Sequence, residues 1–149
     1  MHSSSSPAPL LPTSNAPIAH QWSSGYPMTR RSAAAARSHT RAHLTAWEWA
    51  GDTGDATLIV SELVTNAVRH SARPGRELRL KLTLLESGEL LIDVSDPVAA
   101  FPGFGRAVEP EESEERGRGL LVVQGLGARL SWSAGPDIGK TVRAALAAR

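Results

Sequence analysis

The amino-acid sequence predicts an α+β fold, a two-layer sandwich in which helices cover one face of a mixed, mainly antiparallel sheet. Two observations predict it. Helical patterns fill residues 28–71, whereas strand patterns occur as two pairs, each joined by a turn typical of an antiparallel hairpin. The length of 149 residues and the hydrophobic content of 41% suit one domain with a single core.

The N-terminal segment, residues 1–18, is predicted to be a disordered tail, so that the domain spans residues 19–149. Ser and Pro dominate the tail, which lacks both the basic start and the continuous apolar run of a signal peptide. No apolar run in the chain is long enough to span a bilayer. Cys is absent, which excludes disulfides and thiolate metal sites. These features predict a cytoplasmic protein.

The first elements are a short edge strand at residues 20–26 and a long helix at residues 28–50, which Thr29 would cap and Gly51 would end. Four basic residues precede the first acidic residue of this helix: Arg30, Arg31, Arg37 and Arg41. A basic helix can touch nucleic acid or an acidic partner. The net charge of the whole chain is only +1, which favours a solvated face and predicts no direct nucleic-acid or membrane partner.

The second helix follows a cap at Asp55 or Thr57 and runs to the end of the stretch "SELVTNAVRHS". Its polar border carries Glu62, Asn66 and His70 at successive i, i+4 positions, so a carboxylate and an amide point the same way one turn apart. Such a pair can hold a hydrated divalent cation or position a hydroxyl. An ordinary hydrogen-bonded border would also account for it. The predicted apolar face consists of Ile59, Val60, Leu63, Val64, Ala67 and Val68.

Two hairpins complete the sheet. Residues 78–86 and 89–96 form the first pair, and residues 128–134 and 140–147 form the second, around the turn "GPDIG". Between the pairs, residues 97–119 carry Pro, Gly and Glu without periodicity, and a loop of this length in a compact domain is typical of a functional lid. A short helix is expected at residues 120–126.

The stretch "AGPDIGKT" fits a relaxed phosphate-binding P-loop pattern. That mechanism requires a long helix after the loop, with its N-terminus facing the phosphates. Only eight residues follow Thr141. A hairpin turn at the sheet edge is therefore the preferred interpretation.

Three further features accompany the Glu62–Asn66 pair. Asp96 ends an apolar strand, where a carboxylate can accept a hydrogen bond from an exocyclic amine. Gly117 and Gly119 open a helix, where backbone N–H groups can approach an anion. The hydroxyl of Thr141 on the last hairpin could reach a ligand over the sheet. Each signal alone is weak: an Asp at a strand end is more often a cap or turn former, and a lone Gly-x-Gly that opens a helix is more often a flexible turn.

Together and in this order, these motifs resemble those of the GHKL ATPases, whose Bergerat fold is shared by histidine kinases, gyrase and heat-shock chaperones. The likeness is greatest to the small bacterial anti-sigma factor serine/threonine kinases and covers about residues 20–147. By resemblance, "SELVTNAVRHS" is the N-box, in which Glu62 is the general base and Asn66 the Mg²⁺ ligand. Arg69 or His70 would lie near the phosphates.

The same resemblance implies the remaining contacts to ATP. "VSDP" is similar to the start of the first glycine box, with Asp96 binding adenine, and "GKTV" is similar to the last box, with Thr141 near the ligand. This first box departs from the usual D-x-G-x-G, because Val98 and Ala100 stand at its glycine positions. The second box, "GRGLLVV", would bind nucleotide through Gly117, Arg118, Gly119 and Leu120.

The resemblance implies an ATP- and Mg²⁺-dependent kinase that phosphorylates Ser or Thr of a protein antagonist. A sigma factor is the second partner implied, and a homodimer is one expected assembly. The rival interpretation is a non-catalytic module that binds nucleotide or a partner. The missing glycines favour the rival, whereas Glu62 and Asn66 favour the enzyme.

Overall fold

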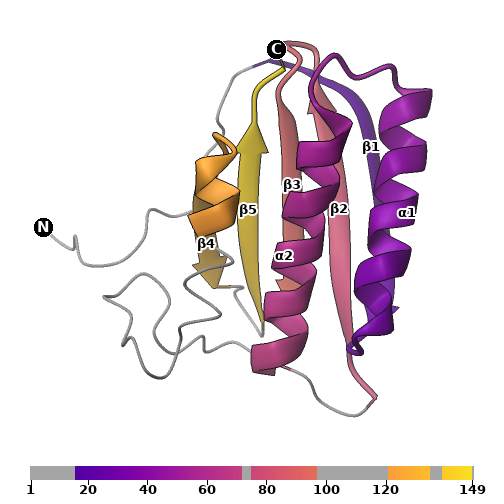
Figure 1. Ribbon diagram of the computed structural model, residues 1–149, viewed down its shortest axis with the longest axis vertical. Coiled ribbons are helices and arrows are strands. Elements are labelled where there is room, and N and C mark those ends of the chain that lie inside the picture. Colours follow the sequence, from indigo (N-terminus) through magenta and orange to yellow (C-terminus); the bar gives the residue numbers. More distant parts are fainter. Residues whose placement is uncertain (1–15, 72–74, 97–120, 135–138, 149) are drawn as a thin grey trace, which may run out of the picture.

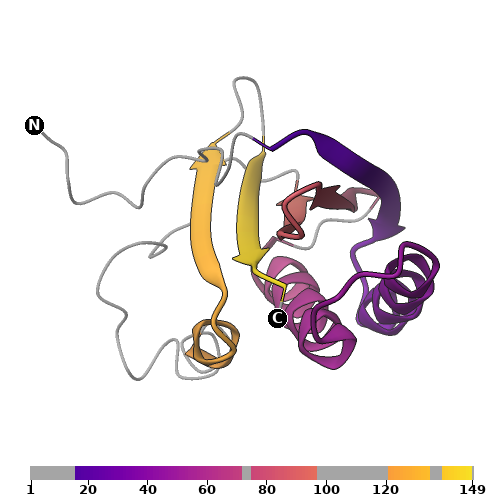
Figure 2. The same ribbon diagram turned by 90° about the horizontal axis from the view of Figure 1, so that it is seen from above.

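The computed structural model describes residues 16–71, 75–96, 121–134 and 139–148. It contains a five-stranded sheet in the order β1-β2-β3-β5-β4, in which every neighbouring pair is antiparallel. Both long helices cover one face of this sheet (Figures 1 and 2). The predicted two-layer α+β sandwich is therefore confirmed. The elements are β1 (Ile18–Pro27), α1 (Arg31–Ala46), α2 (Thr53–Ser71), β2 (Glu77–Leu85), β3 (Leu90–Asp96), β4 (Arg129–Ala134) and β5 (Lys140–Leu146).

The ends of α1 differ from the prediction. Thr29 is not its cap: Arg30 holds that position, and no side chain within the described residues caps it. The helix ends at Ala46, before the predicted stop at Gly51, because the chain reverses at Glu48, whose φ is 56°. The reversal buries Trp49, whose indole Nε1 donates a hydrogen bond to the carbonyl of Gly88 at 2.8 Å. Burial of this large side chain thus overrides the helical pattern.

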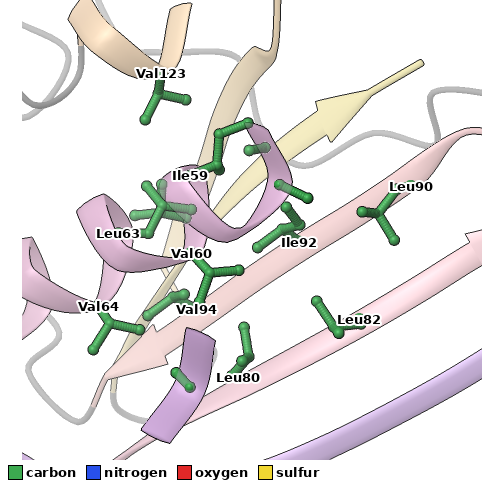
Figure 3. Close-up of a cluster of buried hydrophobic side chains, with 14 of the residues drawn as sticks. Ile59, Val60, Leu63, Val64, Leu80, Leu82, Leu90, Ile92, Val94 and Val123 are labelled. Atoms are coloured by element: carbon green, nitrogen blue, oxygen red, sulfur yellow. The ribbon is translucent and has the colours of Figure 1, made fainter. Parts of the chain in front are cut away.

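The start of α2 also lies earlier than predicted. The carboxylate of Asp52 accepts a hydrogen bond from the backbone N–H of Asp55 at 2.9 Å, so Asp52 is the capping residue. The Thr57 hydroxyl instead donates to the carbonyl of Gly54. The apolar face of α2 packs on the sheet, where Figure 3 shows its side chains above those of β2 and β3. The buried members on this face of α2 are Ala56, Ile59, Val60, Leu63, Val64 and Ala67.

Strand alternation assigns each residue of β3 and β5 to one face of the sheet. Ile92 and Val94 face the helices, as Figure 3 shows, and Val142, Ala144 and Leu146 belong to the same core cluster. The intervening residues face away from the helices, where a small second cluster contains Leu85, Leu91 and Ala145. Asp96 lies two residues after Val94, and Lys140 lies two residues before Val142. Both therefore face the helix layer, as those core residues do.

The β4–β5 hairpin confirms the preferred interpretation of the P-loop-like stretch. Ala134 pairs with Lys140 in antiparallel register, and Gly139 before it has a φ of 90°. Lys140 begins a strand where a P-loop would require a helix. Residues 121–125 form the short helical turn expected before β4. Within the described residues, no helix has the length and apolar character needed to cross a membrane.

Candidate functional site

Two deeply buried charges in the described part of the chain lie at the paired ends of β3 and β5. Asp96 is the last residue of β3 and stands directly opposite Lys140, the first residue of β5. The Lys140 Nζ donates a hydrogen bond to Asp96 Oδ2 at 2.5 Å. Only 3% of the Asp96 side chain and 2% of the Lys140 side chain are exposed. The predicted adenine-binding carboxylate therefore shares a buried ion pair that the sequence analysis did not anticipate.

A second polar group lies on α2. Asn66 is buried, with 7% of its surface exposed, and Glu62 one turn earlier is half-buried. A spacing of four residues places both side chains on one face of the helix. Ser61, next to Glu62, points instead toward α1, because its hydroxyl accepts a hydrogen bond from Arg37 Nη1 at 3.0 Å. The amide and the carboxylate thus lie on a different side of α2 from its contact with α1.

The two polar groups occupy the same end of the molecule. α2 ends at the lower edge of the view in Figure 1, which is also where β5 begins and where its antiparallel partner β3 ends. α2 contacts both strands. Asn66 near the end of α2 and the Asp96–Lys140 pair therefore converge on one end of the sandwich.

Thr141 lies on the opposite face of the sheet from Lys140. Its hydroxyl forms a hydrogen bond of 2.7 Å with the hydroxyl of Ser95, its direct cross-strand neighbour. Asp93 and Arg143 share this outer face, where Arg143 Nε donates to Asp93 Oδ1 at 2.7 Å and Nη2 donates to Oδ2 at 3.0 Å. The hydrogen bond to Asp93 raises the pKa of Arg143. The structure does not place Thr141 with the helix-facing group that contains Asp96.

Arg69 lines a hollow of about 240 Å³ between the start of α1 and the end of α2. The hollow also includes Thr29, Arg30 and Thr65, so it combines two guanidinium groups with two hydroxyls. The structure thus places Arg69 at the junction of the two helices, and its predicted role near phosphates stays a prediction.

Several predicted site residues lie outside the described part of the chain. They are the second glycine box, with Gly117, Arg118, Gly119 and Leu120, and the proposed lid before it. His70 belongs to α2, but its side chain is also outside the described part.

Comparison with known proteins identifies the family. The family described as "Histidine kinase-like ATPase domain" matches residues 26–146. The chain belongs to this family. The resemblance drawn from the N-box and glycine-box motifs is thereby confirmed at the level of the family. No curated protein matches the chain.

Solved structures extend this comparison. The chain is 30% identical to the histidine kinase domain of a blue-light activated histidine kinase from Erythrobacter litoralis EL346, with a TM-score of 0.49; the match covers 63% of this chain and 43% of that domain. The chain thus spans less than half of that relative. A structure of the SiaB–SiaC complex from Pseudomonas aeruginosa matches with 13% identity and a TM-score of 0.56, over 87% of this chain and 89% of that one. This second likeness supports the fold.

A histidine kinase-like ATPase domain implies ATP as its ligand, and the described residues also suit Mg²⁺. No three His, Cys, Asp or Glu side chains in the described ranges gather into a site that could hold a metal ion by themselves. Mg²⁺ commonly uses one or two protein oxygens together with water and substrate phosphates. The Asn66 amide oxygen, with the Glu62 carboxylate one turn away, fits that mode of binding.

Proposed function

We propose that this chain is an ATP-dependent regulatory protein kinase that transfers the γ-phosphoryl group to Ser or Thr of a protein antagonist, as anti-sigma factor kinases do. The observation that carries this proposal is the buried amide of Asn66 one helical turn from the half-buried carboxylate of Glu62. A domain that only holds a partner needs no such pair at this end of the fold. Membership in a kinase-like ATPase family supports the proposal.

In the proposed reaction, the hydroxyl oxygen of the antagonist forms a bond to the γ-phosphorus while the bond from that phosphorus to the β–γ bridging oxygen breaks. ADP leaves, and the Glu62 carboxylate accepts the hydroxyl proton. Asn66 would hold Mg²⁺ through its amide oxygen, and the ion would offset charge on the transferred group. Asp96 would accept a hydrogen bond from the adenine amine.

The partners also belong to the proposal. A protein antagonist would be the substrate, and a sigma factor would be the protein that the kinase sequesters. The SiaB–SiaC structure is a complex of two proteins, which makes binding of a protein partner reasonable for this fold. The alternative function is a regulatory module without catalysis, which Val98 and Ala100 at glycine positions favour.

Replacing Glu62 separates the two functions. Glu62→Ala should lower phosphoryl transfer by about 10²–10⁴ while ATP affinity stays within a few-fold, because a general base acts in the transition state. Asn66→Ala should weaken Mg-ATP binding itself. Ser61→Ala is the matched control on α2: its hydroxyl is bonded to Arg37 of α1, away from the amide and the carboxylate, so it should change neither property.

The measurements are calorimetry with Mg-ATP and transfer of labelled phosphate to proteins captured from the native host. Circular dichroism must first show that each variant is folded, since α2 packs on the core. If the wild type binds Mg-ATP but phosphorylates no captured protein, the non-catalytic alternative stands. If it binds no nucleotide, and Mg-ATP does not raise its melting temperature, neither nucleotide-dependent function stands.

A further inference from the structure

Two arginines at the start of α1 carry charges that no other described group balances. Arg30 and Arg31 are exposed, and neither guanidinium forms a hydrogen bond or an ion pair with another described residue, whereas that of Arg37 bonds Ser61. The first turn of α1 also contains no acidic residue. Cations near the start of a helix oppose its dipole, so this arrangement weakens α1. A local choice that costs stability without a compensating contact is typical of a functional site.

Arg30 lies between two hollows of different character. The basic hollow, of about 240 Å³, lies between the start of α1 and the end of α2, and its walls include the hydroxyls of Thr29 and Thr65. The apolar hollow, of about 680 Å³, lies between the end of β1 and the start of α1, and its mainly apolar walls include Pro27 and Ala35. Because Thr29 and Arg30 line both hollows, the two adjoin at the lower edge of the view in Figure 1.

We propose that these adjoining hollows dock an acidic, extended segment of a protein partner. A carboxylate side chain of the partner would enter the basic hollow, where Arg30 donates hydrogen bonds to it and the hydroxyls of Thr29 and Thr65 complete its surroundings. Guanidinium groups match carboxylates in geometry and charge. Side chains two residues apart in an extended chain point to the same face, so an apolar side chain two positions away would reach the apolar hollow.

Charge complementarity selects this kind of partner. The helix contains no acidic residue from Arg31 to Ala46, so α1 offers an approaching carboxylate attraction without local repulsion. The apolar hollow beside Arg30 favours a peptide over a nucleic-acid backbone, which has no apolar side chain to place there. Side chains of both helices would hold the carboxylate, and the site does not depend on backbone N–H groups at the start of α1.

The docking surface lies away from the proposed ATP site. Ser61 of α2 bonds Arg37 of α1, and Thr65 follows Ser61 by one turn on the same side of the helix. Glu62 and Asn66 lie on a different side. The inference therefore goes beyond the proposed function, because a partner can dock here with or without phosphoryl transfer, and the two proposals can fail separately.

The first test uses the full chain without a purification tag and a synthetic peptide with the repeat Asp-Ser-Leu-Ser, measured by NMR titration. Amide signals at the start of α1 and the end of α2 should shift. A matched peptide with Asn in place of Asp should bind about fivefold more weakly, which is the upper range for an exposed ion pair. Equal affinity for the two peptides, or no binding of either, would overturn the proposal.

The second test asks whether the hollows or the overall charge attract the peptide. Arg30→Gln should weaken binding of the acidic peptide by about fivefold, and Ala35→Asp should weaken it by introducing a repelling carboxylate into the apolar hollow. Arg41→Gln is the matched control, because Arg41 is exposed on the same helix but lines neither hollow. Equal losses for Arg30→Gln and Arg41→Gln would overturn the proposal.

Thermal unfolding separates docking from a structural role of Arg30. Because Arg30→Gln removes a cation from the start of α1, its melting temperature should equal or exceed that of the wild type while its affinity for the peptide falls. A lower melting temperature would mean that Arg30 stabilises the fold, and the argument from an uncompensated charge would fail. A single-stranded oligonucleotide that binds this surface more tightly than the peptide would also overturn the choice of a protein partner.

Discussion

Two ion pairs join the same two strands on opposite faces of the sheet, and they differ in side-chain chemistry and in burial. Asp93 and Arg143 form the outer pair, which faces away from the helices, and Asp96 and Lys140 form the inner pair. Both are direct cross-strand neighbours in one antiparallel ladder. Register therefore accounts for both contacts, and the difference lies in the choice of side chain and in burial.

The outer pair has the geometry of a structural contact. The planar guanidinium of Arg143 makes two hydrogen bonds to Asp93, and 16% of its side chain remains exposed to water. Such a fork is rigid and has fixed directions. The inner pair includes a hydrogen bond from a compact and flexible ammonium, and at most 3% of either side chain is exposed.

The largest effect should follow from breaking the inner pair. Lys140→Met should lower the free energy of unfolding by about 3 kcal/mol, near the low end for removing one partner of a buried ion pair, because the Asp96 carboxylate loses its counter-ion in a dry site. Urea denaturation measures this loss. Adding Asp96→Leu should restore much of it, since the double variant no longer buries a charge. A loss below about 1 kcal/mol for Lys140→Met would mean that other groups or water compensate the carboxylate.

A smaller effect should follow from breaking the outer pair. Arg143→Met should lower the free energy of unfolding by about 2 kcal/mol, because the buried Asp93 loses two charge-assisted hydrogen bonds. The loss is smaller than for the inner pair because 16% of the Arg143 side chain is exposed, so water can approach from the side that this residue occupies. Its affinity for Mg-ATP should match the wild type, since the pair faces away from α1 and α2. Denaturation and calorimetry on the same samples test both parts. A large change in ATP affinity would show that the outer face of the sheet also contributes to nucleotide binding.

The sequence predicted the fold because its signals are local. Alternation located β2, β3, β4 and β5, and the apolar repeat located α2, whose face is the one expected from Ile59 to Ala67. The limits of α1 were wrong, since the reversal at Glu48 depends on a distant contact between Trp49 and the Gly88 carbonyl. A helical pattern carries no information about such a contact.

The candidate site was only partly predictable for a similar reason. Asp96 could be selected because it ends an apolar strand, but its partner Lys140 lies 44 residues later and becomes a neighbour only through the pairing of β3 with β5. The prediction chose Thr141 because its hydroxyl on the last hairpin could reach a ligand over the sheet, and the resemblance supported that choice. Alternation from the core residues Val142 and Ala144 would have assigned Thr141 to the outer face and Lys140 to the inner one.

The smallest effect should come from a third ion pair, which extends the comparison to the surface. Arg129 Nη2 donates to Glu89 Oε2 at 2.7 Å, a distance as short as in the outer pair, but 64% of the Arg129 side chain is exposed. Water solvates the separated charges almost as well as the pair does, so Arg129→Met should cost at most about 0.5 kcal/mol of unfolding free energy. Urea denaturation at low salt and at about 1 M salt measures it, and the difference from the wild type should vanish at high salt, where the screening length falls to about 3 Å. A loss above about 1 kcal/mol that persists in salt would contradict the ranking by burial, because a solvated pair would then stabilise the fold as much as a shielded one.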